Sequence, residues 1–334
     1  MTKTKQNSPL SLFFRIALPI ILATLLIIVL VYFGNVDFQQ LGTFFSQLNI
    51  FHILIIIFSS LFHMTTSALK WQLVLKAFHH DNANHNPPFS FHLFYTTLGA
   101  NLGQVMPIHI SSMITRGIGL KAHYQGSTLS GAASSGFEQI FDILIPLVLL
   151  LPTIFVLTFD MDLSTWLAIS AFILILSGLL LPLVSIKLVE SILRLIGPMA
   201  EQPKRTFFLR KSLDTVLKIN NLDKTLMTKL YWLSVIRFFS LLIRALVVVS
   251  VIASTITYSA VTIALPGVVS TNIIALTPGG LGISEWGWTG LLLLQNVSMQ
   301  DAVAFALLNR IVMILGLLTI LAFSALAFFG RNKI

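Results

Sequence analysis

The sequence contains two interrupted apolar stretches, LGANLGQVMPIHISSMITRG (residues 98–117) and TNIIALTPGGLGISE (residues 271–285). Proline and glycine break each one near its middle, where they disfavour a continuous helix. Irregular backbone at membrane depth is tolerated only where it is buried in protein or lines a wet cavity. If the flanking segments cross a membrane, the two breaks therefore mark the interior of the protein.

The composition indicates that the flanking segments do cross a membrane. Of 334 residues, 56% are apolar and 10% are charged, whereas an average soluble domain is about 25% charged. The apolar runs extend from end to end, so we expect one all-α polytopic membrane domain over residues 1–334. The net charge is +9, but the basic residues flank apolar spans, which favours contact with anionic lipid rather than nucleic acid.

Six segments are apolar over about the ~20 residues that a transmembrane helix needs. Basic residues precede the first of them, as in a signal peptide, but no small-residue cleavage site follows it, so we expect a retained span. The six predicted spans are residues 13–33, 50–69, 127–157, 163–186, 230–253 and 299–329.

Lys and Arg are concentrated on one side of these spans. They occur before the first span, at Lys70 and Lys76 after the second, between the fourth and fifth, and after the last. Because basic residues favour the cytoplasmic side, we expect a cytoplasmic (inner) membrane protein with both termini in the cytoplasm. The other loops contain no Lys or Arg; they are residues 34–49, 158–162, 254–257 and 298–301.

The same charge pattern indicates how the two interrupted segments enter the membrane. Residues 90 and 127 must both lie on the cytoplasmic side if the span 127–157 is to end at the Asp160 loop. Segment 91–126 therefore enters and leaves on the cytoplasmic side, and segment 258–298 enters and leaves on the opposite side. We predict two re-entrant helical hairpins in addition to about six full spans.

Segment 187–229 differs from the rest of the chain in its charge. It holds nine Lys or Arg residues among apolar residues at helical spacing. We interpret it as interfacial helices on the cytoplasmic leaflet, and a solvated basic connector is the alternative.

The two interrupted segments match each other at an offset of 171 residues. Asn101 and Asn272 each lie six residues before the prolines of the breaks, Pro107 and Pro278. A span precedes and follows each hairpin, and the two units have opposite orientations. Inverted-topology repeats of this kind occur in transporters that bind substrate at the repeat interface. Chance register between Leu-rich segments is the alternative. The predicted units are residues 50–157 and 230–329.

Ionisable residues within spans are costly and usually face a partner or a wet cavity. Glu138 and Asp142 share a helix face. Four arginines are set against three acids, which leaves a guanidinium group free to chelate a phosphate. The alternative is internal pairing, for example of Glu138 with Arg310 or Arg244, and Arg237 could snorkel to the interface. The full set is Arg116, Glu138, Asp142, Arg237, Arg244, Glu285 and Arg310.

The sequence carries no motif for hydrolysis, nucleotide binding or metal binding. HExxH and GxxxxGK[ST] are absent, and the glycines after Pro278 fit a tight break between half-helices. His79, His80 and His85 lie in a polar loop without the spacing of a coordination site, whereas His109 beside the first break could contact a headgroup. We therefore predict no catalytic residue, no metal and no cofactor.

These motifs resemble those of the lysylphosphatidylglycerol synthase transmembrane-region family, also called the flippase-like domain family. The resemblance rests on the two interrupted stretches, the helix with Glu138, and a last span with Asn309 and Arg310. SALKWQLVL (residues 67–75) is similar to the family's basic-aromatic motif. The resemblance covers about residues 10–330 and implies a flippase unit for aminoacylated phosphatidylglycerol, or a relative that accompanies hopanoid or glycolipid biosynthesis. Because the chain stops at Ile334, we expect no aminoacyl-transferase domain.

The resemblance also implies functional roles for individual residues. The first break lacks the glycines that the family usually has there, and Gln139 stands where the family often has arginine. We predict a flippase for an anionic or aminoacylated phospholipid or a polyprenyl-phosphate-type lipid. The alternatives are a non-catalytic accessory protein for a lipid- or glycan-biosynthetic enzyme, and an intramembrane transferase. The candidate substrate-binding residues are Asn101, Pro107, Arg116, Glu138, Arg244, Asn272, Pro278, Gly279, Gly280, Glu285 and Arg310.

Overall fold

The computed structural model describes residues 9–35, 38–78, 87–196, 224–252, 256–273 and 277–330, which are helical and contain no strand. The elements are α1 (Pro9–Gly34), α2 (Phe38–Gln47), α3 (Ile50–Phe78), α4 (Phe89–Leu102), α5 (Ile108–Tyr124), α6 (Thr128–Phe159), α7 (Leu163–Ile196), α9 (Lys224–Ile252), α10 (Tyr258–Thr271), the 3-10 turn η3 (Pro278–Gly280), α11 (Ile283–Leu293) and α12 (Met299–Gly330). The predicted all-α fold class is confirmed.

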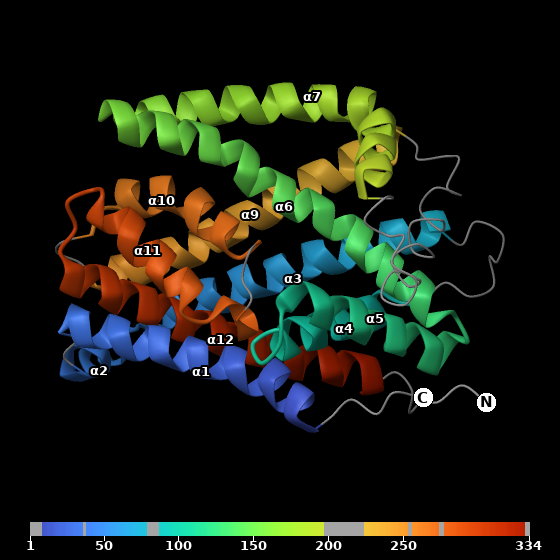
Figure 1. The fold of residues 1–334 in the computed structure, drawn as a ribbon, viewed down its shortest axis with the longest axis horizontal. Helices are drawn as coiled ribbons and strands as arrows, with labels where there is room; N and C mark the ends of the chain where they lie inside the picture. The colour runs from blue at the N-terminus through green and yellow to red at the C-terminus, as the bar shows by residue number, and fades with distance from the viewer. Residues whose placement is uncertain are drawn as a thin grey trace.

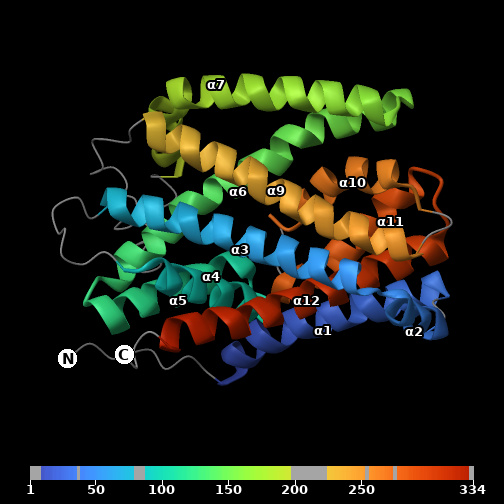
Figure 2. The ribbon, with the colours of Figure 1, turned by 180° about the vertical axis from the view of Figure 1, so that it is seen from behind.

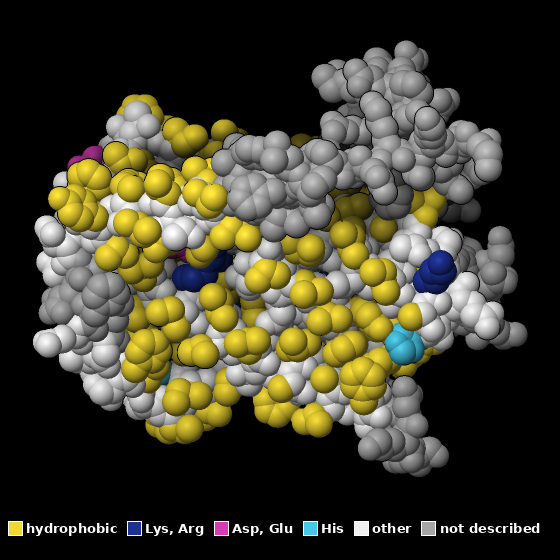
Figure 3. Space-filling view, turned by 60° about the horizontal axis from the view of Figure 1, so that its bottom comes forward, with side chains coloured by type: hydrophobic (Ala, Val, Ile, Leu, Met, Phe, Trp, Pro, Cys, Tyr) yellow, Lys and Arg dark blue, Asp and Glu magenta, His cyan; other side chains and the backbone are white. Residues whose placement is uncertain are grey.

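Five helices in the described part of the chain, α3, α6, α7, α9 and α12, are long and apolar enough to cross a membrane. The chain is therefore a multi-pass membrane protein. The first predicted span is helical as α1. Large apolar side chains such as Phe172 (65% exposed) and Leu179 (66% exposed) lie on the outer surface. Figure 3 shows apolar side chains spread over the described part of one face. Such a surface suits lipid rather than water.

Two boundaries differ from the sequence-based expectation. The loop predicted at residues 34–49 contains α2, a short helix with an amphipathic composition. Helix α7 continues to Ile196, beyond the predicted end of its span at residue 186. Residues 197–223 lie outside the described residues, so the interfacial helices predicted within 187–229 stay a prediction there.

The helices run roughly along the long axis of the molecule, with α7 at one edge and α1 at the opposite edge (Figures 1 and 2). The α4–α5 hairpin opens at the C-terminal end of α12, where the rings of Phe94 and Phe328 stack 5.2 Å apart. The α10–α11 hairpin opens at the other end of α12, where Gln295 Nε2 donates to the carbonyl oxygen of Ala260 at 3.0 Å. The two hairpins therefore approach the middle of the bundle from opposite ends.

The breaks of the two hairpins contact each other. The backbone N–H of Gly279 donates to the carbonyl oxygen of Met106 at 3.4 Å. Gly279 has φ 58°, and a Cβ there would lie 3.0 Å from Gln104 Cα. Glycine is needed at this position because a side chain would meet both a backbone strain and a close neighbour.

The lengths of the helices and the way they pack support the predicted internal repeat. Helices α6 and α12 are both 32 residues long, and both their ends are 171 positions apart. Helix α5 packs on α6 as α11 packs on α12, and α4 packs on α12 as α10 packs on α6. The inverted orientation of the repeats in a membrane stays a prediction that this correspondence supports.

Helix α1 lies outside both repeat units and packs against the second break. A Cβ on Gly282, which has φ 83°, would lie 2.6 Å from Leu26 Cβ. The indole nitrogen of Trp286 donates to the carbonyl oxygen of Leu26 at 3.1 Å. The start of α11 is thus attached to α1.

We expect Gly131→Ala to lower the free energy of unfolding by about 1–3 kcal/mol. A Cβ at Gly131 would lie 2.8 Å from Gly117 Cα and 2.9 Å from the carbonyl oxygen of Arg116, so α5 and α6 would have to move apart. Thermal unfolding of the purified protein in detergent measures the loss. Gly290→Ala is the matched control, because nothing lies within 4 Å of its added Cβ. An equal effect of the two substitutions would contradict this packing.

Cysteine labelling can test the orientation of the hairpins, because the natural chain has no cysteine. His123 is at the open end of the first hairpin and Ser298 follows the second. We expect a membrane-impermeant maleimide to label Ser298→Cys in intact cells, and His123→Cys only after the membrane is permeabilised. Labelling of both from the same side would contradict the opposite entry of the hairpins.

Candidate functional site

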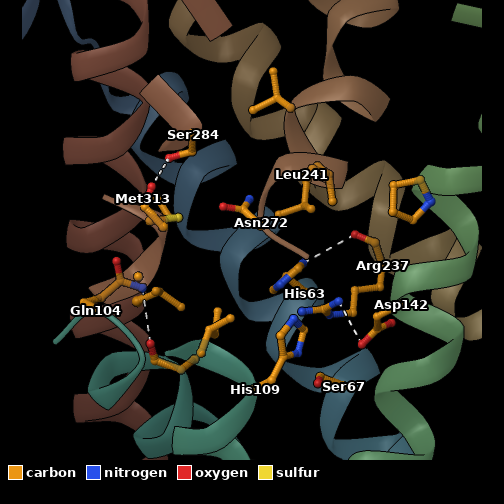
Figure 4. Close-up of a pocket in the computed structure, with 18 of the residues that line it drawn as sticks. His63, Ser67, Gln104, His109, Asp142, Arg237, Leu241, Asn272, Ser284 and Met313 are labelled. Carbon is orange, nitrogen blue, oxygen red and sulfur yellow. Dashed lines mark hydrogen bonds and ion pairs between the residues drawn. The ribbon is translucent and has the colours of Figure 1, made fainter. Parts of the chain in front are cut away.

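A cavity of about 220 Å³ lies where the two breaks meet. Its walls come from both hairpins and from α3, α6, α9 and α12. Figure 4 shows Asn272 between His63 and Leu241 on one side and Ser284 and Met313 on the other. Figure 3 shows a basic side chain, with an acidic one beside it, recessed among apolar side chains left of the centre of the view. The described part of the protein therefore holds a polar chamber inside an apolar bundle.

The first ion pair of the chamber joins Arg116 on α5 to Glu138 on α6, with 2.5 Å between Nη1 and Oε1. The arginine is 2% exposed and the glutamate 1%. The guanidinium group also donates to the hydroxyl groups of Ser67, Thr96 and Ser135. These contacts engage both terminal nitrogens, Nη1 and Nη2, and leave only Nε without a partner, so Arg116 is fixed in place rather than free to follow a ligand.

Lys70 is buried at the centre of the same cluster, with 0% of its surface exposed. Its ammonium group pairs with Asp142 and lies 3.3 Å from Oε2 of Glu138. The assignment of Lys70 to a cytoplasmic flank is wrong, because α3 continues past the predicted end at residue 69 to Phe78. The absence of Pro and Gly between residues 50 and 78 is the signal that predicts this longer helix.

Arg237 on α9 completes the cluster. Its Nη1 lies 2.9 Å from Oδ2 of Asp142 (Figure 4). The side chain is 22% exposed and lines the cavity. The alternative that Arg237 snorkels to the interface is wrong, since its charge is paired inside the bundle.

The second break has an ion pair of its own, between Glu285 on α11 and Arg310 on α12, with 2.8 Å between Oε1 and Nε. Arg310 Nη2 also donates to the carbonyl oxygen of Gly279 at 2.9 Å. Oε2 of Glu285 accepts the backbone N–H of Gly282 at 2.7 Å. The pair therefore holds the second break together by binding its free backbone groups.

The two pairs occupy corresponding places with the charges exchanged. In each repeat the pair joins the second helix of the hairpin to the span that follows it. The first repeat has arginine on the hairpin (Arg116) and glutamate on the span (Glu138), whereas the second has Glu285 on the hairpin and Arg310 on the span. Internal pairing thus occurs, but the suggested pairs of Glu138 with Arg310 or Arg244 are not the ones formed.

Arg244 differs from the other basic residues of the chamber. It is 5% exposed and lines the cavity, and its Nε, like that of the other three arginines, has no hydrogen-bond partner. No described carboxylate lies within ion-pair distance of it. Lys70 and four arginines stand against three acids in and around the chamber, so its formal charge is positive.

The remaining predicted residues divide into two groups. Pro107, Asn272, Gly279 and Gly280 line the cavity, and Pro278 is buried at the second break. Asn101 does not line the cavity. Its Nδ2 donates to the carbonyl oxygens of Thr97 at 2.9 Å and Leu317 at 3.1 Å, which ties α4 to α12.

Two histidines of the chamber are hydrogen-bonded to uncharged polar side chains. His63 lies 2.9 Å from Ser240 Oγ, and His109 lies 2.8 Å from Gln139 Oε1. His63 could not be singled out from the sequence, because a single histidine on an apolar helix carries no motif. His79, His80 and His85 lie outside the described residues. Within the described ranges, no group of three His, Cys, Asp or Glu side chains could hold a metal ion.

The long apolar helices make this a polytopic membrane protein. The basic chamber between the two breaks gives it a polar site in its interior. The chain belongs to the lysylphosphatidylglycerol synthase TM region family, whose model matches residues 16–322. The match covers nearly the whole chain, so the resemblance of the motifs is confirmed and the function is related to membrane lipids. Searches of curated proteins and of solved structures each found no match.

We expect Glu138→Gln to lower the free energy of unfolding by about 3 kcal/mol. The substitution removes the negative charge that neutralises Arg116 and leaves Lys70 with Asp142 alone, so positive charge is buried without a partner. The midpoint of thermal unfolding in detergent measures the change. Asp160→Asn is the matched control, since Asp160 ends the same helix on the exposed surface. Equal midpoints for the two variants would show that the buried network does not stabilise the fold.

Proposed function

We propose that this protein is a lipid translocator that moves a phospholipid or polyprenyl-phosphate-type lipid between the leaflets of the cytoplasmic membrane. The observation that supports it best is the position of the chamber. It lies where the breaks of two corresponding hairpins meet, and unpaired positive charge faces into it. Transporters with inverted repeats bind substrate at such a place, and guanidinium groups bind phosphate well.

In this proposal the headgroup enters the chamber while the acyl tails stay in the hydrocarbon. The walls come from both repeats, so a movement of one repeat relative to the other would change which side of the chamber is open. The two hairpins approach from opposite ends of α12, which would give each leaflet its own gate. The pairs Arg116–Glu138 and Glu285–Arg310 would keep each hairpin attached to its span during this motion.

A role as a non-catalytic partner of a lipid- or glycan-biosynthetic enzyme is the second candidate. The observation that favours it is the extent of internal pairing, because Arg116, Arg237 and Arg310 all brace helices against one another. A transferase reaction has less support. Its candidate bases, Glu138 and Glu285, are both held in ion pairs, whereas a general base must contact the substrate group from which it takes a proton.

We expect Arg310→Ala and Glu285→Ala to abolish lipid translocation while the protein still inserts and folds, since each removes half of the pair at the second break. The measurement is the loss of a fluorescent phospholipid from one leaflet of proteoliposomes, followed with a membrane-impermeant quencher. Lys229→Ala, at an exposed position of α9, is the control. Full translocation by both variants, or none by the natural protein, would contradict the proposal.

A further inference from the structure

We infer that the chamber selects an anionic lipid headgroup that carries no cationic substituent. This inference rests on the proposed function in taking a lipid headgroup as the occupant, and it goes further by naming the charge of that headgroup. Two observations carry it. Each carboxylate of the chamber is already neutralised by the protein, and the unpaired charge that remains is positive.

The carboxylates of the first cluster are already ion-paired with basic side chains of the protein, although Oε2 of Glu138 accepts no hydrogen bond. Oε1 of Glu138 binds Arg116, and Oε2 lies 3.3 Å from the Lys70 ammonium group. Asp142 binds Lys70 through Oδ1 and Arg237 through Oδ2. An ammonium group on a ligand would have to displace one of these buried partners and leave it without compensation, which is strongly unfavourable.

The carboxylate of the second break is occupied in the same way. Oε1 of Glu285 lies 2.8 Å from Arg310 Nε, and Oε2 accepts the N–H of Gly282 at 2.7 Å. Glu285 is 2% exposed. Its carboxylate therefore closes the break instead of facing a ligand, and an amino-acid ester on a headgroup would find no described carboxylate to receive its amine.

Arg244 has the opposite character. Its exposed fraction is 5%, it lines the cavity, and no described carboxylate lies within ion-pair distance of it. Arg237 and Arg310 line the same cavity and are partly exposed, 22% and 11%. A phosphate group would supply the missing negative charge and accept hydrogen bonds from guanidinium groups, which present several N–H donors in a fixed plane.

The uncharged polar side chains of the chamber can form hydrogen bonds with the part of the headgroup beyond its phosphate, if that part is polar and uncharged. Asn272 lies in the middle of the cavity in Figure 4, and an amide both donates to and accepts from hydroxyl groups. Gln104 and His109 also line the cavity. The pattern fits a phosphodiester with hydroxyl groups better than a phosphodiester with an amine.

The test compares three lipids on the purified full chain in detergent, by native mass spectrometry with equal lipid concentrations. The probes are dioleoylphosphatidylglycerol, its lysyl ester and dioleoylphosphatidylethanolamine. We expect dioleoylphosphatidylglycerol to bind at least about 10-fold more tightly than either lipid that carries an ammonium group, because that group would meet a positively charged chamber in which every described carboxylate is already ion-paired. Equal or tighter binding of the lysyl ester would overturn the inference and leave translocation untouched.

Substitutions of Arg244 separate binding from folding. Arg244→Met should weaken binding of dioleoylphosphatidylglycerol by about 10- to 100-fold. It should not lower the unfolding temperature in lipid-free detergent, because it removes an uncompensated buried charge. Arg244→Lys keeps the positive charge but loses the planar guanidinium group with its several N–H donors, so we expect binding of intermediate strength. If Arg244→Met fails to fold, Arg244→Lys is the variant that tests the inference. Lys229→Met, an exposed charge on the same helix, should change neither quantity. Unchanged lipid preference in both Arg244 variants would overturn the inference.

A last arm distinguishes a lipid from a free anion. Glycerol 1-phosphate should compete only weakly with dioleoylphosphatidylglycerol, since it lacks the acyl tails whose burial contributes to binding. Competition at equal concentration would overturn the assignment to a lipid. If the lipid binds in an Arg244-dependent way but proteoliposomes show no translocation, the proposed function fails and the headgroup inference stands.

Discussion

A buried charge in an apolar bundle is stable only when a partner compensates it, and this constraint determines how the helices of this protein are joined. Lys70 on α3, Arg116 on α5 and Arg237 on α9 converge on two acids of α6, Glu138 and Asp142. Apolar packing alone would let these helices slide or rotate, because lipid is as apolar as their surfaces. The ion pairs remove that freedom by giving each helix one register against α6.

The breaks in the two hairpins depend on the same kind of compensation. Interrupting a helix frees backbone N–H and C=O groups that must find partners away from water. At the second break, Arg310 binds the carbonyl oxygen of Gly279 and Glu285 binds the N–H of Gly282. At the first break, the backbone N–H groups of Gly103, Gln104 and Met106 donate to carbonyl oxygens of α4, and Ser111 Oγ donates to the carbonyl oxygen of Gly99 at 2.8 Å. The second break is therefore closed by a charged pair and the first by uncharged hydrogen bonds, which makes the two halves chemically unequal despite their matched lengths.

Hydropathy and the positions of Pro and Gly were sufficient to predict the helices and their two interruptions, because both depend on local properties of the chain. The pairing of charges was not predictable in the same way. It depends on which helix faces meet, and spacing along one helix does not contain that information. Lys70 shows the difficulty, since a lysine near a predicted span end is normally interfacial. Asn101 shows the converse, because a matched position in a repeat proved to hold α4 to α12 rather than to line the chamber. The short helix α2 was missed because it is too polar to be read as a span.

Helix α1 is attached to the second break, and this makes the surroundings of the two hairpins different, because α1 belongs to neither repeat. The first hairpin has no counterpart of α1 among the described elements, whereas α11 starts against Leu26 and is bonded to it through Trp286. Any motion that carries the second hairpin away must break this bond or take α1 along. In the proposed translocation cycle, a movement of the second hairpin would therefore involve α1, whereas a movement of the first hairpin would not, so the two movements would differ in energy.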